Sequence, residues 1–231
     1  MITSRDIANM IDHSLLKPDL TVDDVIEGCA IAKHYKVASV CVRPCDVALA
    51  KKQLEGSSVL VTTVIGFPHG SHKTETKVFE AEQAMDDGAV ELDMVLNIGR
   101  LKSKDFDYVE KDIRAVVDCA HKRGMIVKVI LENCYLTDEL KEMGCRIAER
   151  AGADYVKTST GFGTGGATIP DLELMRRTVS SHVKLKAAGG VRTLDAALAV
   201  KKAGAYRFGA TATKVIMEEA LKRESEGTLK E

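Results

Sequence analysis

The sequence predicts an α/β protein that folds as a single (β/α)8 barrel over residues 1–231. Short apolar segments typical of buried strands alternate with helical segments along the chain, and such alternation requires a parallel sheet. Eight repeats in 231 residues fit a closed barrel. An open doubly wound sheet is the competing architecture, but it more usually has six strands. The glycine-rich nucleotide fingerprint of that fold is also absent after the first strand.

The strands are predicted from compact runs of apolar and β-branched residues that end at a glycine, a proline or a polar loop. Pro18 stops the first strand, and a glycine-rich loop follows Lys157 at the end of the sixth. The eight predicted strands span residues 10–16, 37–42, 59–65, 90–95, 126–131, 154–157, 183–187 and 206–209.

The helices are predicted from apolar residues at helical spacing and from capping signals at the ends. Thr21, Thr137 and Thr193 are expected N-terminal caps, and Pro44 and Pro170 each begin a helix. The predicted helical segments lie around residues 21–29, 44–54, 78–85, 109–120, 137–147, 170–178, 194–203 and 213–224.

Composition excludes several classes of partner. The formal net charge is -1, which gives no indication of binding to nucleic acid or to an anionic membrane. No apolar run reaches the ~20 residues that span a bilayer, and the N-terminus lacks a signal-peptide pattern. The six cysteines form neither a CxxC pair nor a disulfide framework. We therefore expect reduced thiols in a cytoplasmic protein.

Polar residues near the carboxyl ends of the predicted strands are the candidate site residues, because barrel enzymes place their active sites there. Strand parity puts Glu91 on the same face as Asp93, and Lys184 on the same face as Lys186. Glu91 and Lys184 lie earlier in their strands, so we expect them toward the opposite end of the barrel as a structural pair. The candidates are Asp12, Asp93, Lys128, Lys157 and Lys186.

Lys157 and Lys186 end neighbouring strands and should lie close together. A nearby cation disfavours protonation, so at least one of these lysines should have a lowered pKa. A neutral lysine can attack a carbonyl group and form a Schiff base. Asp93 could balance the charge and relay protons through water. Position alone does not decide which lysine reacts, and the alternative is a buried Asp–Lys pair that only holds the interior together.

A phosphate site is predicted after the seventh and eighth strands. Gly189 and Gly190 follow the seventh strand, and Gly209 and Thr211 follow the eighth. Barrels often bind phosphate with these two loops, where glycines let backbone N–H groups approach the oxygens. Alternatively, these glycines only serve turns. Arg192 could pair with the phosphate or cap its loop.

Two further pairs are expected to be structural. His69 and His72 have H-x-x-H spacing, but no further metal ligands cluster nearby, so we expect loop structure and helix capping. Cys41 and Cys45 are expected to be packing residues. No metal site and no cofactor are predicted.

Five motifs resemble the deoxyribose-phosphate aldolase family, and the resemblance covers nearly the whole chain. The motifs are residues 12–17, 66–70, 91–95, 157–162 and 186–193. The resemblance implies a class I aldolase on a (β/α)8 barrel, acting without a metal. It implies reversible cleavage of 2-deoxy-D-ribose 5-phosphate to acetaldehyde and D-glyceraldehyde 3-phosphate in deoxyribose catabolism. It also implies a homo-oligomer, either a dimer or a tetramer.

The same resemblance assigns roles to individual residues. Lys157 matches the Schiff-base lysine, Lys186 the second lysine that lowers the pKa of its neighbour, and Asp93 the proton donor and acceptor. The residues implied in substrate and phosphate binding are Asp12, Lys128, Thr158, Gly161, Gly189, Gly190, Gly209 and Thr211. The chain departs from the family in the segment 209–213, where Thr211 replaces a more usual serine. It also lacks the C-terminal tyrosine that some members place over the phosphate.

Three other functions compete with this interpretation. A different Schiff-base aldolase would use another aldehyde donor, and a metal-dependent aldolase would lose activity in a chelator. A non-catalytic sugar-phosphate binding barrel would keep the glycine loops but would need neither Lys157 nor Lys186.

Overall fold

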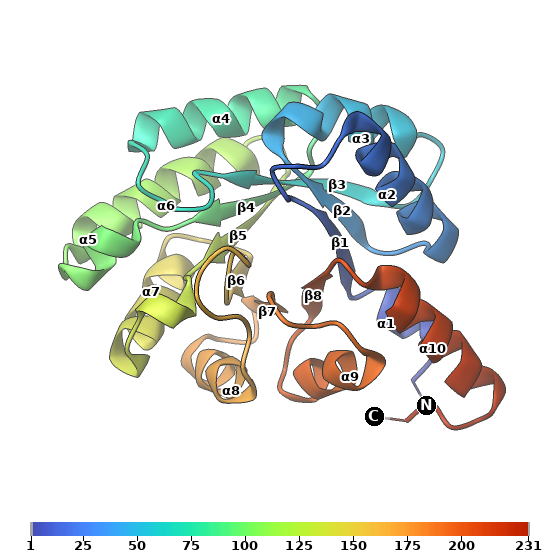
Figure 1. Ribbon diagram of the computed structural model, residues 1–231. Helices are drawn as coiled ribbons and strands as arrows, with labels where there is room; N and C mark the ends of the chain where they lie inside the picture. Colours follow the sequence, from blue (N-terminus) through green and yellow to red (C-terminus); the bar gives the residue numbers. More distant parts are fainter. Residues whose placement is uncertain (1, 231) are drawn as a thin grey trace.

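The computed structural model describes residues 2–230, in which eight parallel strands form one closed barrel. Each strand pairs with the next along the chain, and β8 pairs with β1 to close the ring (Figure 1). The predicted fold class is confirmed. The strands are β1 (Ile11–Leu15), β2 (Ser39–Val42), β3 (Leu60–Ile65), β4 (Glu91–Val95), β5 (Ile126–Ile130), β6 (Tyr155–Lys157), β7 (Lys184–Ala187) and β8 (Arg207–Ala210).

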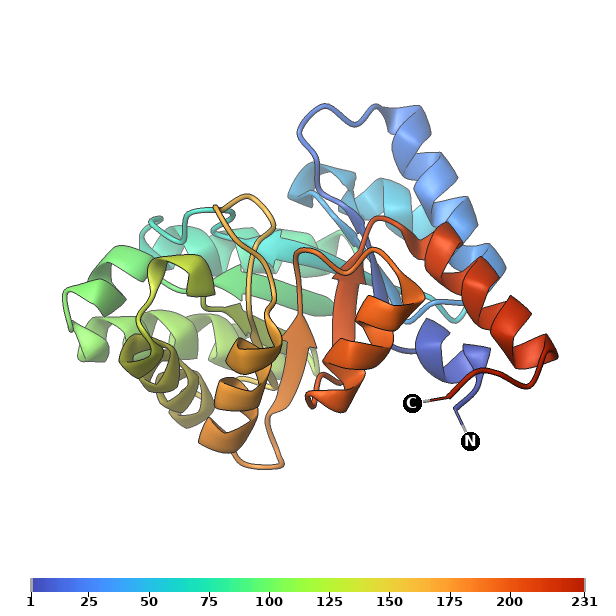
Figure 2. The same ribbon diagram turned by 60° about the horizontal axis from the view of Figure 1, so that its bottom comes forward.

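The helices form an outer layer around the strands (Figures 1 and 2). Two 3-10 helices, η1 (Pro44–Asp46) and η2 (Asn133–Tyr135), follow β2 and β5. The α-helices are α1 (Ser4–Ala8), α2 (Val22–Tyr35), α3 (Val47–Gln53), α4 (Thr74–Asp86), α5 (Ile98–Lys102), α6 (Phe106–His121), α7 (Asp138–Arg150), α8 (Ile169–Thr178), α9 (Leu194–Lys202) and α10 (Thr213–Ser225). Among the described residues, no helix is both long and apolar enough to cross a bilayer.

Two short helices were not predicted because they are too short to show a helical period. The first, α1, begins with a capping box in which the Thr3 hydroxyl accepts from the N–H of Asp6, and the Asp6 carboxylate accepts from the N–H of Thr3. Helix α5 begins at Asn97, whose side chain accepts from the N–H of Arg100. Helix α1 packs against α10 (Figure 1), and the N–H of Ser4 donates to Glu224.

Several predicted strands begin too early because burial extends beyond the ladder of hydrogen bonds. Val37 is buried, yet β2 begins only at Ser39. The N–H of Ala38 donates to the carbonyls of Ala8 and Ile11 at 3.1 Å, in the turn that leads into the barrel. An apolar run in the sequence therefore predicts which residues are buried, whereas the hydrogen bonds to the neighbouring strands determine where the strand begins.

Strand alternation places charged side chains inside the barrel and apolar side chains under the helices. On β4, Leu92 and Met94 belong to the apolar core, whereas Glu91 and Asp93 are buried in the interior. A charged group away from water is tolerated only when it is paired. The interior of this barrel must therefore be a network of ion pairs.

Candidate active site

The two candidate lysines are direct neighbours in the sheet. Lys157 ends β6, and its Cα partner on β7 is Lys186. Both side chains are almost fully buried, with exposed fractions of 3% and 1%. The prediction that they lie side by side on neighbouring strands is therefore confirmed by the register.

Asp93 joins the two lysines through a single oxygen. Lys157 Nζ and Lys186 Nζ each donate to Asp93 Oδ2 at 2.7 Å, and Lys128 Nζ donates to Asp93 Oδ1 at 2.9 Å. The Asp93 carboxylate is fully buried and lies among three ammonium groups. Asp93 therefore links Lys157 to Lys186 and to Lys128.

Below this carboxylate lies a second layer of ion pairs. Asp12 receives Nε of Arg207 at 2.8 Å and the hydroxyl of Ser39 at 2.7 Å, and its Oδ2 lies 2.5 Å from Lys186 Nζ. Glu91 receives Lys128 Nζ at 2.5 Å and Nη2 of Arg207 at 3.2 Å. The interior cluster consists of the carboxylates Asp12, Glu91 and Asp93 and the cations Lys128, Lys157, Lys186 and Arg207.

The interior cluster has one cation too many. With all seven groups ionised, four positive charges face three negative ones. A buried excess charge is costly, and loss of one proton removes it. Lys157 is the best candidate to lose that proton, because Asp93 is the only described carboxylate within ion-pair distance of it and Asp93 is shared with two other lysines.

The pKa directions agree with this count. Burial lowers the pKa of Lys157, and the cation of Lys186 lowers it further against the opposing attraction of Asp93. Burial also disfavours the charged form of Lys186, but the carboxylates of Asp12 and Asp93 outweigh it and raise the pKa of Lys186. At Asp93, burial is overcome by the three lysines, which hold its pKa well below the ordinary value. Of the two candidate lysines, Lys157 is thus the one whose pKa is lowered, and a neutral lysine can act as a nucleophile.

A cavity of about 380 Å³ opens above the two lysines. Lys157, Lys186 and Asp12 line its floor, and the loops that follow β6, β7 and β8 form its walls. The wall residues include the glycines predicted to bind phosphate, with Thr211 and Arg192 beside them. The lining residues from these loops are Thr160, Gly161, Phe162, Ala188, Gly189, Gly190, Val191, Arg192, Gly209, Ala210 and Thr211.

The loops after β6 and β7 are tied together closely. The N–H of Ala167 donates to the carbonyls of Ala188 and Gly189 at 2.9 and 3.0 Å. A Cβ atom at Gly166 would lie 2.4 Å from the carbonyl oxygen of Gly189, so the contact requires glycine. Gly189 and Gly190 both have positive φ, a backbone conformation that favours glycine, and a Cβ atom at Gly190 would meet no described atom within 4 Å.

The sequence is similar to those of known aldolases along nearly its whole length. Residues 7–217 match the family described as DeoC/LacD family aldolase. The chain belongs to this family. Its members are aldolases, so the protein is a lyase that acts on carbon–carbon bonds.

Named relatives cover almost the whole chain. A deoxyribose-phosphate aldolase of Thermococcus gammatolerans is 53% identical over 221 residues, which is 95% of this chain and 98% of the relative. One from Clostridium perfringens is 53% identical over 214 residues, covering 93% and 95%. A deoxyribose phosphate aldolase from Aeropyrum pernix, whose structure is described as a unique tetrameric one, matches with a TM-score of 0.85 and 31% identity, covering 94% of this chain and 92% of that one.

Two of the predicted substrate-binding residues of this DeoC/LacD aldolase lie away from the cavity. Lys128 is fully buried among Glu91 and Asp93 and does not line the cavity. Thr158 is also fully buried, and its hydroxyl donates to the carbonyl of Ala188 at 3.1 Å and accepts from its N–H. Lys128 instead contacts Asp93, and Thr158 contacts Ala188 in the wall of the cavity.

The predicted pairing of Glu91 with Lys184 is wrong. Glu91 is taken up by Lys128 and Arg207, whereas Lys184 Nζ lies over the ring of Tyr206, 4.1 Å from its centroid. Lys184 is the first residue of β7 and exposed, so it lies outside the interior cluster. Residues on one strand face thus reach different layers, which parity alone cannot distinguish.

The expectations for cysteine and histidine are partly corrected. Cys41 is buried and lines the cavity, but Cys45 is exposed and therefore does not pack in the core. Burial raises the pKa of the Cys41 thiol to about 11. His69 and His72 are exposed in the loop after β3, and within residues 2–230 no cluster of His, Cys, Asp and Glu could hold a metal ion.

Sequence reasoning missed two residues that shape the site. Arg207 begins β8 and binds both Asp12 and Glu91, but its neighbours in the sequence give no indication of a buried partner. Glu132 follows β5 in the left-handed conformation, with φ of 56°. Its buried carboxylate accepts from the N–H of Thr160 at 3.1 Å and from the Thr160 hydroxyl, and so holds the cavity wall in place.

Proposed function

We propose that the protein is a class I deoxyribose-phosphate aldolase that cleaves 2-deoxy-D-ribose 5-phosphate reversibly through a Schiff base on Lys157. The observation that carries this proposal is a buried lysine with a lowered pKa at the floor of a cavity, 2.7 Å from a shared carboxylate. The names of the relatives support the substrate. The barrel over residues 1–231 is then the single catalytic domain.

The reaction follows from the neutral amine. Lys157 attacks the C1 aldehyde of the open-chain sugar, and loss of water gives a protonated imine. A base removes the proton of the C3 hydroxyl, the C2–C3 bond breaks, and its electron pair flows to the imine to leave an enamine. The C3 carbonyl leaves as D-glyceraldehyde 3-phosphate. Protonation of the enamine at C2, followed by hydrolysis, releases acetaldehyde and restores the lysine.

Lys186 and Asp93 are proposed to carry the protons. Their contact at 2.7 Å beside Lys157 allows a proton to move between them, with water joining them to the substrate. Asp12 lines the cavity and lies 2.5 Å from Lys186 Nζ, so it holds the charged form of that lysine. The cavity lining does not include Lys128 or Thr158, so we propose that they act on the substrate indirectly, by holding Asp93 and Ala188 in position.

The glycine loops are proposed to bind the 5-phosphate. Backbone N–H groups of Gly161, Gly189, Gly190 and Gly209 would approach its oxygens, with the Thr211 hydroxyl as a further donor. Phosphate binding anchors the substrate so that its aldehyde end meets Lys157. No metal or cofactor takes part in this proposal. We further propose a homo-oligomer of two or four chains in the cytoplasm, and the tetrameric description of the Aeropyrum pernix relative supports the oligomer.

The deciding experiment is borohydride reduction in the presence of acetaldehyde, followed by peptide mass mapping. The label is expected on Lys157 and should be absent in Lys157→Ala. Lys17 also lines the cavity, so Lys17→Ala is the matched control and should keep both label and turnover. A label on Lys186 in the wild type would reverse the assignment. Turnover without any label, lost in EDTA and restored by zinc, would instead indicate a metal-dependent aldolase.

A further inference from the structure

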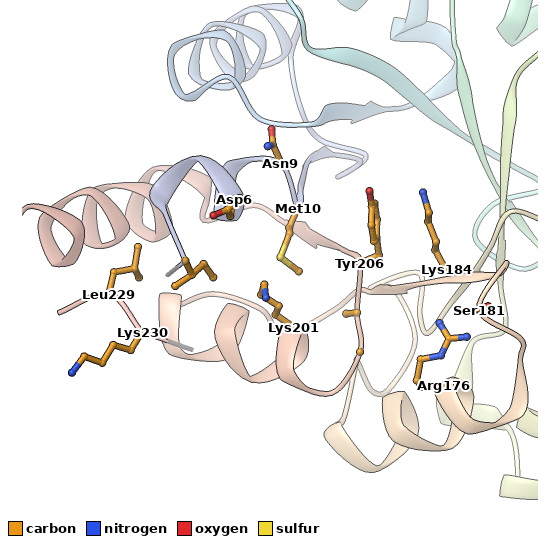
Figure 3. A pocket seen from close by; sticks show the side chains of 13 residues that line it. Asp6, Asn9, Met10, Arg176, Ser181, Lys184, Lys201, Tyr206, Leu229 and Lys230 are labelled. Atoms are coloured by element: carbon orange, nitrogen blue, oxygen red, sulfur yellow. The ribbon is translucent and has the colours of Figure 1, made fainter. Parts of the chain in front are cut away.

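A second cavity, of about 930 Å³, lies at the end of the barrel opposite the catalytic one (Figure 3). It is lined by the start of β7 at Lys184, by the segment before β8, by α8 and α9, and by residues near both ends of the chain. On β7, the catalytic cavity is lined by Lys186 rather than by Lys184, and the two cavities share no lining residue. They are therefore separate sites.

The lining of this second cavity is strongly basic. Among the lining residues that the structure describes, four are cationic and Asp6 is the one carboxylate; the cations are Arg176, Lys184, Lys201 and Lys230. Asp6 already accepts from the N–H and the hydroxyl of Thr3 at the start of α1. A concave surface lined by one sign of charge concentrates its field and attracts ligands of the opposite sign. This cavity favours an anion.

Two of these cations are fixed in position without being neutralised by a carboxylate. In the part of the chain that the structure describes, Lys184 Nζ lies 4.1 Å from the ring centroid of Tyr206 and 5.7 Å from that of Tyr155, with no carboxylate paired to it. Figure 3 shows Lys184 and Tyr206 side by side. Arg176 donates to the carbonyls of Val179 and Val183, which holds the guanidinium in place, and no carboxylate within residues 2–230 forms an ion pair with it.

The same cavity also has apolar walls. Ile2, Met10, Ala205 and Leu229 line it, and all four are buried or nearly so. Its volume falls within the range of small-molecule sites, ~300–1,000 Å³. Tyr206 is 54% exposed, and the Lys184 cation lies over its ring. A ligand that fits would combine an anionic head with a flat, partly apolar body.

We propose that this cavity is a second binding site, specific for an organic phosphate monoester with a planar ring, of the nucleoside monophosphate class. The phosphate lies against Lys184 and Arg176, and the ring lies against Tyr206 and Met10. Inorganic phosphate would lack the ring contacts, and an uncharged nucleoside would lack the head group. Because the cavity is separate from the catalytic lysines, binding there does not require the proposed aldolase reaction.

The test is isothermal titration calorimetry with adenosine 5′-monophosphate as probe, with inorganic phosphate and adenosine as comparison ligands. Lys184→Glu reverses the central charge, and Tyr206→Ala removes the ring. Lys111→Glu makes the same charge change at an exposed position of α6 outside the cavity and is the matched control. Gly190→Asp places a carboxylate in the catalytic cavity, so it reports binding there.

The expected result is binding of the nucleotide to the wild type at low salt, weakened about tenfold or more in Lys184→Glu and in Tyr206→Ala. Lys111→Glu and Gly190→Asp should bind as the wild type does, and both comparison ligands should bind at least about tenfold more weakly. Equal binding by wild type and Lys184→Glu would overturn the proposal. So would no binding at millimolar nucleotide, or a loss confined to Gly190→Asp. Unchanged aldol cleavage in Lys184→Glu would show that the variant folds.

Discussion

Replacing Lys186 with methionine tests whether the neighbouring cation keeps Lys157 neutral. Both ammonium nitrogens lie 2.7 Å from Asp93 Oδ2, so they can be no further apart than twice that distance. At roughly 5 Å and an effective dielectric constant near 20, two positive charges repel by about 3 kcal/mol. Removing Lys186 leaves three cations facing three carboxylates. The pKa of Lys157 should then rise, because the excess positive charge that favours its neutral form is gone.

The assay is the rate of borohydride trapping with acetaldehyde across a pH series. At neutral pH, Lys186→Met should trap about tenfold to a hundredfold more slowly than the wild type, because the pKa of Lys157 rises and less neutral amine is present. Trapping should recover as the pH increases, whereas turnover should stay low because the proton carrier is gone. Lys17→Met is the control for loss of a lysine from the cavity lining.

Trapping by Lys186→Met at the wild-type rate at neutral pH would refute the electrostatic argument. A pH profile displaced toward lower pH would refute it more directly, since the sign of the effect would then be opposite to that of a lost cation. Mass mapping of the trapped peptide ensures that the rate refers to Lys157.

Three further predictions concern the walls and the support of the site. Gly190→Asp should raise the KM of the phosphorylated sugar and leave the poor turnover of free deoxyribose nearly unchanged. Steady-state kinetics on both sugars would contradict a phosphate site if kcat/KM fell equally for the two. Glu132→Ala should reduce kcat/KM about tenfold by releasing Thr160, whereas Thr160→Ser, which keeps the hydroxyl, should remain close to the wild type. Lys128→Met should lower the free energy of unfolding by about 3–5 kcal/mol in urea, because Glu91 loses the closer of its two cationic partners and keeps only Arg207 at 3.2 Å. Adding Glu91→Gln should restore part of that loss, and additive losses would contradict the pairing.

The sequence was sufficient to predict the barrel and the adjacency of the two candidate lysines. Regular alternation fixes a parallel sheet, and neighbouring strands in such a sheet must bring Lys157 and Lys186 together. The depth of each charged side chain inside the barrel could not be predicted, because strand parity gives the face of the sheet on which a side chain lies but not its position along the barrel axis. Lys128 and Lys184 are both lysines on inward positions of their strands, yet one is fully buried and the other exposed.

Local irregularity was equally hidden. Glu132 adopts a left-handed backbone conformation that residues other than glycine rarely adopt. Nothing in the flanking residues predicts this conformation. Its function depends on Thr160, which lies on another loop and is reached only once the barrel has closed. Contacts of this kind are products of tertiary structure, and single-sequence patterns report only local preferences.

The signs of the interior charges are divided between the two halves of the chain. Strands β1 and β4 supply the carboxylates Asp12, Glu91 and Asp93, whereas β5 to β8 supply every cation of the cluster. A half-barrel cut between α6 and β5 would therefore bury charge of a single sign and could not pair with a copy of itself. The two unlike halves would attract each other instead. Fragments expressed together should reassemble into one barrel more readily at low salt, while each alone should fail to fold.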